Sequence, residues 1–158
     1  MGLDMYLNAT RRLMGHIEDP KDTYQKVLEV TGSNNLSTDD AKYMKVDITC
    51  AYWRKANAIH KWFVDNVQGG TDDCGEYDVS REQLESLKTI CGKILAASSE
   101  GNSWVNIATE LLPSQGGFFF GSTEYDEYYL EDLRSTIVQI DRILEAPDDW
   151  YFSYHSSW

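Results

Sequence analysis

The sequence is poor in cysteine and has no long apolar run. Its three cysteines, Cys50, Cys74 and Cys91, are odd in number and form no C-x-x-C pair, which argues against a disulfide framework and against a zinc knuckle. No apolar stretch approaches the roughly 20 residues of a membrane span, and the first residues lack the basic region and apolar stretch of a signal peptide. We therefore expect free thiols in a reducing compartment, the cytoplasm, and no membrane partner.

Lysine and arginine are scarce relative to the acids. The chain has 14 of them against 26 aspartates and glutamates, and its formal net charge is −12. Such a charge disfavours general binding to nucleic acid or to an anionic membrane surface, because both depend on clustered cations. One local anion pocket remains compatible with it. The same charge also suits a protein that covers a basic surface, including a surface that normally holds DNA.

The standard catalytic motifs are missing. None of His16, His60 and His155 stands in an H-E-x-x-H pattern, and there is no G-x-S-x-G elbow and no phosphate-binding G-x-x-x-x-G-K-[ST] loop. The acidic stretch 72–78 lacks calcium-loop spacing and is interpreted as a solvated loop. Cys74 or Cys91 with His60 would suit a nucleophile pair, but separated cysteines and histidines occur in most chains. We predict no catalytic residue, no metal site and no cofactor.

Apolar and aromatic residues are sufficient for one domain. The 158 residues are 42% hydrophobic, which allows a sizeable core. Aromatic side chains are plentiful, with five Trp, ten Tyr and five Phe. Most of them are expected in the core. The excess is available to line a pocket or an interface, including an interface between copies of the chain.

Hydrophobic periodicity predicts strands at both ends of the sequence. Leu3, Met5 and Leu7 alternate with polar residues, as in a half-buried strand, and the stretch 150–154 repeats this alternation. A further strand is predicted at 45–50. Short terminal strands need a partner, so we expect the two to pair with each other.

Apolar residues at helical spacing predict three main helices. They begin near Tyr52, at a capping box formed by Ser80 and Gln83, and near Thr123, which with Asp126 is expected to cap the last helix. Shorter helices are expected after Asp19-Pro20, stopping at Gly32, and over 104–112.

The resulting fold prediction is a single α+β domain spanning 1–158. Its small antiparallel sheet includes both terminal strands and packs against the three main helices. The segment 14–45 is interpreted as a variable insertion or excursion from this domain.

Three stretches of the sequence, Met1–Leu7, Ala51–Asn57 and Gly117–Tyr128, together resemble a family of small proteins encoded by tailed bacteriophages and their prophages. The resemblance implies a phage accessory protein that acts in the cytoplasm of the infected bacterium. Small phage accessory proteins often counter host defence, either by inhibiting a defence protein or by sequestering its nucleotide signal. The resemblance assigns no catalytic residue, and none of it is carried onto 14–45.

The helix that follows the second strand carries the first candidate site. Trp53, Asn57 and His60 recur at steps of four and three, so they share one helical face beside the core. An aromatic ring, an amide and an imidazole suit a polar, partly aromatic ligand. Arg54 and Lys61 lie toward the polar side and, with the helix N-terminus, favour a local anion site. The structural alternative is that Trp53 belongs to the core, His60 is a hydrogen-bonded histidine at its border, and the cations pair with nearby acids.

A glycine-rich segment, 114–122, is the second candidate. Its glycines allow the backbone to approach a ligand closely, and Gln115 and Ser122 add hydrogen-bonding groups. Glu124 and Asp126 follow at the start of the last helix, where a phosphate would otherwise lie, and suit a ribose hydroxyl or a cation better. The structural alternative is a tight turn whose phenylalanines fill the core.

From these two segments we predict a phage counter-defence protein that sequesters a small nucleotide-derived signal without cleaving it. One alternative is an acidic inhibitor that blocks a basic, nucleic-acid-binding surface of a host defence protein. A second alternative is a nucleotide-cleaving enzyme. The predicted ligand-binding residues are Trp53, Arg54, Asn57, His60, Lys61, Gln115, Phe119, Ser122 and Tyr125.

Overall fold

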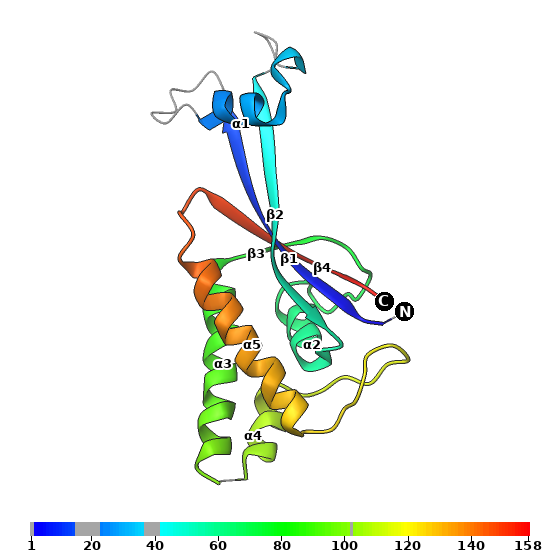
Figure 1. Ribbon diagram of the computed structural model, residues 1–158. Coiled ribbons are helices and arrows are strands. Elements are labelled where there is room, and N and C mark those ends of the chain that lie inside the picture. The colour runs from blue at the N-terminus through cyan, green and yellow to red at the C-terminus, as the bar shows by residue number, and fades with distance from the viewer. Residues whose placement is uncertain (1, 15–22, 37–41, 102) are drawn as a thin grey trace.

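The computed structural model describes residues 2–14, 23–36, 42–101 and 103–158. Four strands form one open antiparallel sheet in the order β2-β1-β4-β3 (Figure 1). The strands are β1 (Asp4–Met14), β2 (Tyr43–Arg54), β3 (Tyr77–Val79) and β4 (Trp150–Ser157). The first and last strands lie side by side in the middle of the sheet, which confirms the predicted α+β fold with both terminal strands in one antiparallel sheet.

The described residues form five α-helices and one short 3₁₀ turn. They are α1 (Thr23–Thr31), η1 (Asn34–Leu36), α2 (Asn57–Asn66), α3 (Arg81–Ser99), α4 (Trp104–Leu111) and α5 (Glu127–Leu144). The long helices α3 and α5 run side by side, with α4 against the far end of α3 (Figure 1). Within the described ranges, no helix combines the length and apolar character needed to cross a membrane.

The main core forms between the sheet and helices α2, α3 and α5. The predicted alternation in β1 is confirmed, because Leu3, Met5 and Leu7 are fully buried. Across the sheet, Tyr154 of β4 pairs with Leu7 and stacks on Phe63 of α2 with the ring centroids 4.0 Å apart. Burial of such side chains stabilises the folded state by roughly 1.5–3 kcal/mol each.

Strands β1 and β2 continue past the sheet as a two-stranded arm. The pairing of β1 with β4 ends at Arg11, whereas its pairing with β2 extends to Met14. At the tip, where Figure 1 shows α1, a small cluster of Leu13, Tyr24 and Leu28 is separate from the main core. The described parts of the predicted excursion 14–45 are therefore the outer part of this arm. The predicted helix start at Asp19-Pro20 lies outside the described residues.

The ends of the long helices are fixed by side-chain caps. The predicted capping box of α3 is confirmed: the Gln83 amide donates to Ser80 Oγ over 3.1 Å, and the Ser80 amide donates to Gln83 Oε1 over 2.8 Å. For α5 the prediction of Thr123 as the capping residue was wrong. Asp126 itself is the N-cap, and its Oδ1 accepts from the amide of Tyr129 over 3.1 Å.

The predicted start of the helix that follows the second strand was also wrong. We expected a helix from Tyr52, but β2 continues to Arg54 and α2 begins at Asn57. Tyr52 and Trp53 pair with Tyr6 and Met5 of β1, so tertiary strand pairing overrides their helical spacing. The first predicted segment, which contains Trp53, Asn57 and His60, is therefore divided between the end of β2 and the start of α2.

Candidate functional site

The turn between β2 and α2 has an unusual backbone conformation at Lys55. Its φ is 59°, the left-handed region that non-glycine residues adopt rarely and at a cost on the order of 1–3 kcal/mol. The turn is held because the Lys55 amide donates to the Leu3 carbonyl over 2.8 Å and the Asn57 amide donates to the Lys55 carbonyl over 2.9 Å. Backbone strain of this kind concentrates at functional sites, so the surroundings of Lys55 are a candidate site.

The glycine-rich loop crosses this turn at close range. Gly121 has a φ of 87°, and a Cβ atom there would lie 3.2 Å from the Cβ of Lys55 and 3.4 Å from its carbonyl oxygen. Only glycine combines this conformation with so close an approach. The two predicted segments are thus brought together at Lys55 and Gly121.

Asn57 fixes the loop to the start of α2. Its side chain is only 5% exposed, and its Nδ2 donates to the carbonyl oxygens of Phe120 over 3.0 Å and Ser122 over 2.7 Å. Its Oδ1 accepts from the Gln115 amide over 3.0 Å. Both amide hydrogens are therefore used within the protein. In this arrangement Asn57 positions the loop and has no donor left for a ligand.

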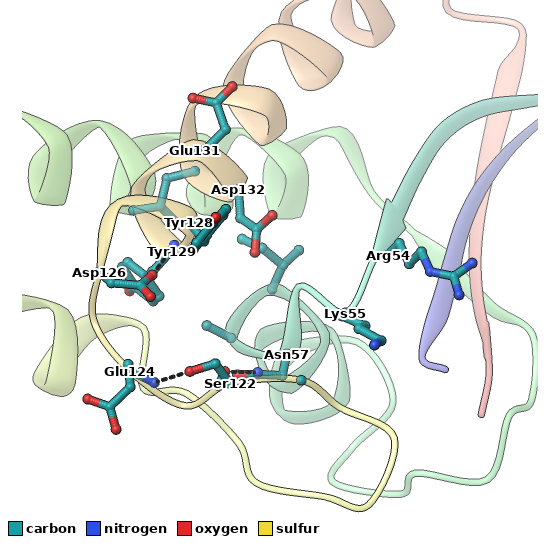
Figure 2. Close-up of a pocket in the computed structure, with 14 residues that line it drawn as sticks. Arg54, Lys55, Asn57, Ser122, Glu124, Asp126, Tyr128, Tyr129, Glu131 and Asp132 are labelled. Atoms are coloured by element: carbon teal, nitrogen blue, oxygen red, sulfur yellow. Dashed lines mark hydrogen bonds between the residues drawn. The ribbon is translucent and has the colours of Figure 1, made fainter. Parts of the chain in front are cut away.

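A cavity of about 330 Å³ lies between the turn, the loop and the first turns of α5 (Figure 2). This volume is at the small end of the range for small-molecule sites. Cations and acids both line it, the cations from the β2–α2 turn and the acids from α5 and the residues just before it. The charged lining residues are Arg54, Lys55, Glu124, Asp126, Glu131 and Asp132.

Asp132 is the acid whose environment is most perturbed. Figure 2 shows its carboxyl group directed into the cavity, and it accepts no hydrogen bond from any residue that the structure describes. Burial, with the negative charges of Glu131 and Asp126, raises the pKa of this carboxyl to about 6. A half-buried carboxylate without a donor is stabilised by a ligand that brings a cation or hydrogen-bond donors.

The opposite wall carries the two cations. The guanidinium of Arg54 is exposed, and in Figure 2 it points away from α5; its Nη1 lies 3.6 Å from Asp4 Oδ1. Lys55 is exposed as well. Because exposed ion pairs contribute little, Arg54 is free to exchange Asp4 for a ligand anion. The cavity is thus lined by cations on one side and by acids on the other.

An exposed tyrosine completes the rim. Tyr128 lines the cavity and is 83% exposed, whereas the neighbouring Tyr129 is buried and donates its hydroxyl to the Leu112 carbonyl over 2.9 Å. An exposed ring beside a polar cavity offers a surface on which a planar group can stack.

Two of the predicted site residues lie away from this cavity. Trp53 is 3% exposed and donates its Nε1 hydrogen to Thr136 Oγ1 over 2.9 Å. His60 is fully buried, with Nδ1 2.7 Å from the Tyr154 hydroxyl and Nε2 3.0 Å from Asp72 Oδ2. Both side chains hold helices to the sheet or to a loop. The structural alternative expected Trp53 in the core, but it placed His60 at the border of the core, and His60 is fully buried.

Of the remaining predicted residues, three line the cavity, three support its loop, and Lys61 does neither. Arg54, Asn57 and Ser122 line the cavity. Lys61 lies on α2 with its Nζ 2.7 Å from Asp65 Oδ2. Three others support the loop: Gln115 donates its amide to Asn57, the carbonyl of Phe119 accepts from Leu3, and the hydroxyl oxygen of Tyr125 accepts from Ser114.

Sequence reasoning missed Lys55, Tyr128, Glu131 and Asp132, which the structure brings to the cavity. One signal for three of them was present: Tyr128, Glu131 and Asp132 are spaced by three and four residues and so share a face of α5. The position of Lys55 depends on its left-handed turn, which no sequence pattern announced.

The thiols of Cys50 and Cys91 are poor nucleophiles. Burial raises the pKa of Cys50 to about 11 and that of Cys91 to about 12, so both are protonated at neutral pH. Cys74 is exposed. Both ring nitrogens of His60 are already engaged. Among the described residues, no three histidines, cysteines or acids gather in a way that would hold a metal ion.

Comparison with protein-family models, with curated proteins and with solved structures found no match to this chain. The assignment of a function therefore depends on the geometry of the cavity and its surroundings.

Proposed function

We propose that the protein binds a small, bipolar, nucleotide-like molecule in the cavity between Arg54 and Asp132 and holds it without cleaving it. The observation that carries this proposal is the carboxyl group of Asp132, which faces the cavity with a raised pKa and no donor among the described residues. A perturbed acid in a cleft is a good indicator of a ligand site.

The two walls of the cavity match the two ends of such a ligand. A phosphate would meet Arg54 and Lys55, and the hydroxyls of a ribose or the amino group of a base would donate to Asp132 and Glu131. Hydrogen bonds to a charged group contribute about 1.5–3 kcal/mol each. Stacking of the base on Tyr128 would add contact area. The acids exclude phosphate from the α5 side, so the ligand has one orientation.

The biological setting follows from the resemblance to phage accessory proteins. In an infected bacterium, a protein that captures a nucleotide-derived immune signal and does not cleave it would lower the free concentration of the signal. Sequestration requires a protein concentration comparable to that of the signal, because each protein molecule removes one signal molecule.

The test is a titration with a panel of cyclic mononucleotides, cyclic dinucleotides and ADP-ribose-type nucleotides. We expect at least one of them to raise the melting temperature and to show saturable binding in calorimetry. Asp132→Asn and Arg54→Ala should each weaken that binding by at least about tenfold, the equivalent of 1.4 kcal/mol. The matched controls, Glu145→Gln and Arg142→Ala, alter exposed residues at the other end of α5 and should leave it unchanged.

Two readouts would decide against the proposal. If no member of the panel shifts the melting temperature, the hypothesis that the protein captures a nucleotide-like ligand is wrong. Recovery of a cleaved product after denaturation of the complex would replace sequestration by hydrolysis, whereas intact ligand is expected.

A second candidate function is an acidic inhibitor that covers a basic surface of another protein. The observation that favours it is the net charge of −12, together with exposed acids on the first turns of α5. Glu127 and Glu131 lie there, 2.6 and 3.1 Å from Arg134. Reversal of both to lysine should abolish the inhibitory effect and its dependence on salt. Reversal of Glu85 and Glu110, exposed acids on α3 and α4, makes the same change in net charge and serves as the control.

A further inference from the structure

The tip of the glycine-rich loop displays a phenylalanine that the fold does not use. Phe118 is 94% exposed, whereas Phe120, two residues later, is buried and packs edge-on against His60. A single exposed apolar residue is ordinary on a protein surface. The features that set Phe118 apart are the way its backbone is held and the acidic segments that are connected to its turn.

A hydrogen-bonded turn presents this side chain. The amide of Phe120 donates to the carbonyl of Gly117 over 3.2 Å, so Phe118 and Phe119 are the central residues of the turn. A Cβ atom on Gly117 would lie 2.7 Å from the ring of Phe120, so this position requires glycine. The carbonyl of Phe119 accepts from the amide of Leu3 over 3.1 Å, which ties the turn to the start of β1.

The side chain of Asn57 also holds the turn in place. Asn57 bonds both flanks of the loop, at Gln115 and at Phe120 and Ser122. The ring of Phe118 meets that of Phe119 edge-on, with centroids 4.8 Å apart. A residue presented by a pre-ordered backbone loses little conformational entropy when it is buried in a complex.

Acidic segments are connected to the turn along the chain and through packing. The loop continues through Gly121, which lies against Lys55, and Ser122 into the acids that line the cavity. The ring of Phe120 packs against Trp158, whose Nε1 donates to Asp72 Oδ1 over 3.1 Å. Asp72 begins the acidic stretch 72–78. An exposed aromatic side chain on a chain of net charge −12, with acidic segments connected to its turn, has the composition of an interface anchor with a charged rim.

We propose that the turn Gly117–Phe120 is a docking point for a protein whose surface combines an apolar pocket, which takes the ring of Phe118, with a basic rim, which faces the two acidic segments. The charge of the rim is the argument for a partner of this chemistry: a second copy of the chain would bring acids against acids. The proposal rests on the second candidate function, to which it gives a place of contact, and it does not depend on ligand capture.

The experiment places the photoreactive residue p-benzoylphenylalanine at position 118 of the full chain in bacterial cells. The control places it at Val138, which is exposed on α5. Proteins that become cross-linked are identified by mass spectrometry, the contacted segment is mapped, and the purified partner is titrated with the wild-type chain and its variants at two salt concentrations.

The expected result is one partner that is joined through position 118 and not through 138, at a segment rich in lysine and arginine. Phe118→Ala should lower the affinity by at least about tenfold, as for an interface hot spot, and Phe118→Trp should restore it in part. Because Phe118 is 94% exposed, Phe118→Ala should leave the melting temperature unchanged. Phe120→Ala, which removes a buried ring, should lower the melting temperature.

Several results would overturn the proposal. They are the absence of a cross-link at 118, the same cross-links at 118 and 138, a cross-link only to a second copy of the chain, and unchanged affinity of Phe118→Ala for the partner. If Phe118→Ala binds normally but the Glu127 and Glu131 reversals abolish binding, this docking point is wrong and the second candidate function stands. If neither change affects binding, both are wrong.

Discussion

Asp132 is the residue at which folding stability and ligand binding oppose each other. Burial raises the pKa of its carboxyl from the ordinary value of 3.8 to about 6 in the folded protein, so between pH 4 and 6 the folded state binds the extra proton. The free energy of unfolding should therefore fall as pH rises through this window. Above pH 6 the buried carboxylate is ionised, and its destabilisation of the folded state is complete. We predict that Asp132→Asn removes this dependence and raises stability at pH 7 by about 1–2 kcal/mol, after a discount for partial exposure.

Urea denaturation from pH 4 to 8 measures this effect. Glu145→Gln, an exposed acid at the end of the same helix, is the control and should follow the wild type. If the two variants share one pH profile, the environment of Asp132 is ordinary. A variant that is more stable and yet binds ligand less well is typical of a residue retained for function at a cost in stability.

Asn57 contributes to the site by holding its loop. Substitution by alanine leaves the carbonyls of Phe120 and Ser122 and the amide of Gln115 without their partner. We predict a loss of about 1–3 kcal/mol in the free energy of unfolding, because partly buried polar groups lose hydrogen bonds. Hydrogen exchange should become faster at the amides of 115–122. Asn106→Ala, at an exposed position of α4, should change stability by less than about 0.5 kcal/mol.

Among the elements, Arg81 of α3 links that helix to the C-terminal end of α5. Its guanidinium donates to the carbonyls of Leu144, Ala146 and Pro147 over 3.2, 2.9 and 2.8 Å, and lies 5.2 Å from the ring centroid of Phe152. It thereby satisfies the Leu144 carbonyl, which the last turn of α5 leaves unpaired, and holds the segment that follows the helix.

We predict that Arg81→Met lowers the free energy of unfolding by about 1–3 kcal/mol, since the aliphatic replacement keeps the packing and loses the hydrogen bonds. Thermal denaturation followed by circular dichroism measures it. Arg142→Met, at an exposed position of α5, should have little effect. Equal losses in the two variants would show that charge, and not the link to the α5 carbonyls, is responsible.

The elements were predictable where their periodicity was unambiguous. The alternation of Leu3, Met5 and Leu7 identified β1, and the Ser80–Gln83 pair identified the start of α3. The boundary between β2 and α2 was not predictable, because Tyr52 and Trp53 fit a helix by spacing and a strand by their aromatic character. Pairing with β1, more than 40 positions away, decides between the two.

The site was predictable only in outline. The segments beginning at Asn57 and Gln115 meet as expected, but the contact between them joins residues 58 positions apart and assigns the amide to the loop rather than to a ligand. The burial of Asp132, from which its raised pKa follows, arises from the packing of α5 against the turn and has no counterpart in local pattern.

At the scale of the whole molecule, the arm is a separable part. Its tip cluster of Leu13, Tyr24 and Leu28 is distinct from the main core, and Arg12 pairs directly with Lys45. We predict that replacement of residues 13–44 by Asn-Gly, which closes two-residue hairpins, gives a folded chain. The melting temperature of its main core should be nearly unchanged, because the contacts of the sheet with α2, α3 and α5 are retained.

Calorimetry of the shortened chain, with nucleotide titration as a second readout, tests this prediction. A replacement of the same kind in the body, for example of residues 67–76 between α2 and β3, removes Asp72 from His60 and should destabilise the fold. If the chain without the arm fails to fold, the arm belongs to the same cooperative unit as the core.

The adjacency of β1 and β4 has a consequence for the order of synthesis. On the ribosome β1 can pair with β2 early, but its second edge stays open until residues 150–157 have emerged about 100 residues later, which takes roughly 5–20 s at typical elongation rates. Throughout that interval the nascent chain displays an unpaired strand edge whose apolar face lacks Tyr154, and such edges recruit other strands. Translation speed between β2 and β4 should therefore govern how much of the protein reaches its native sheet.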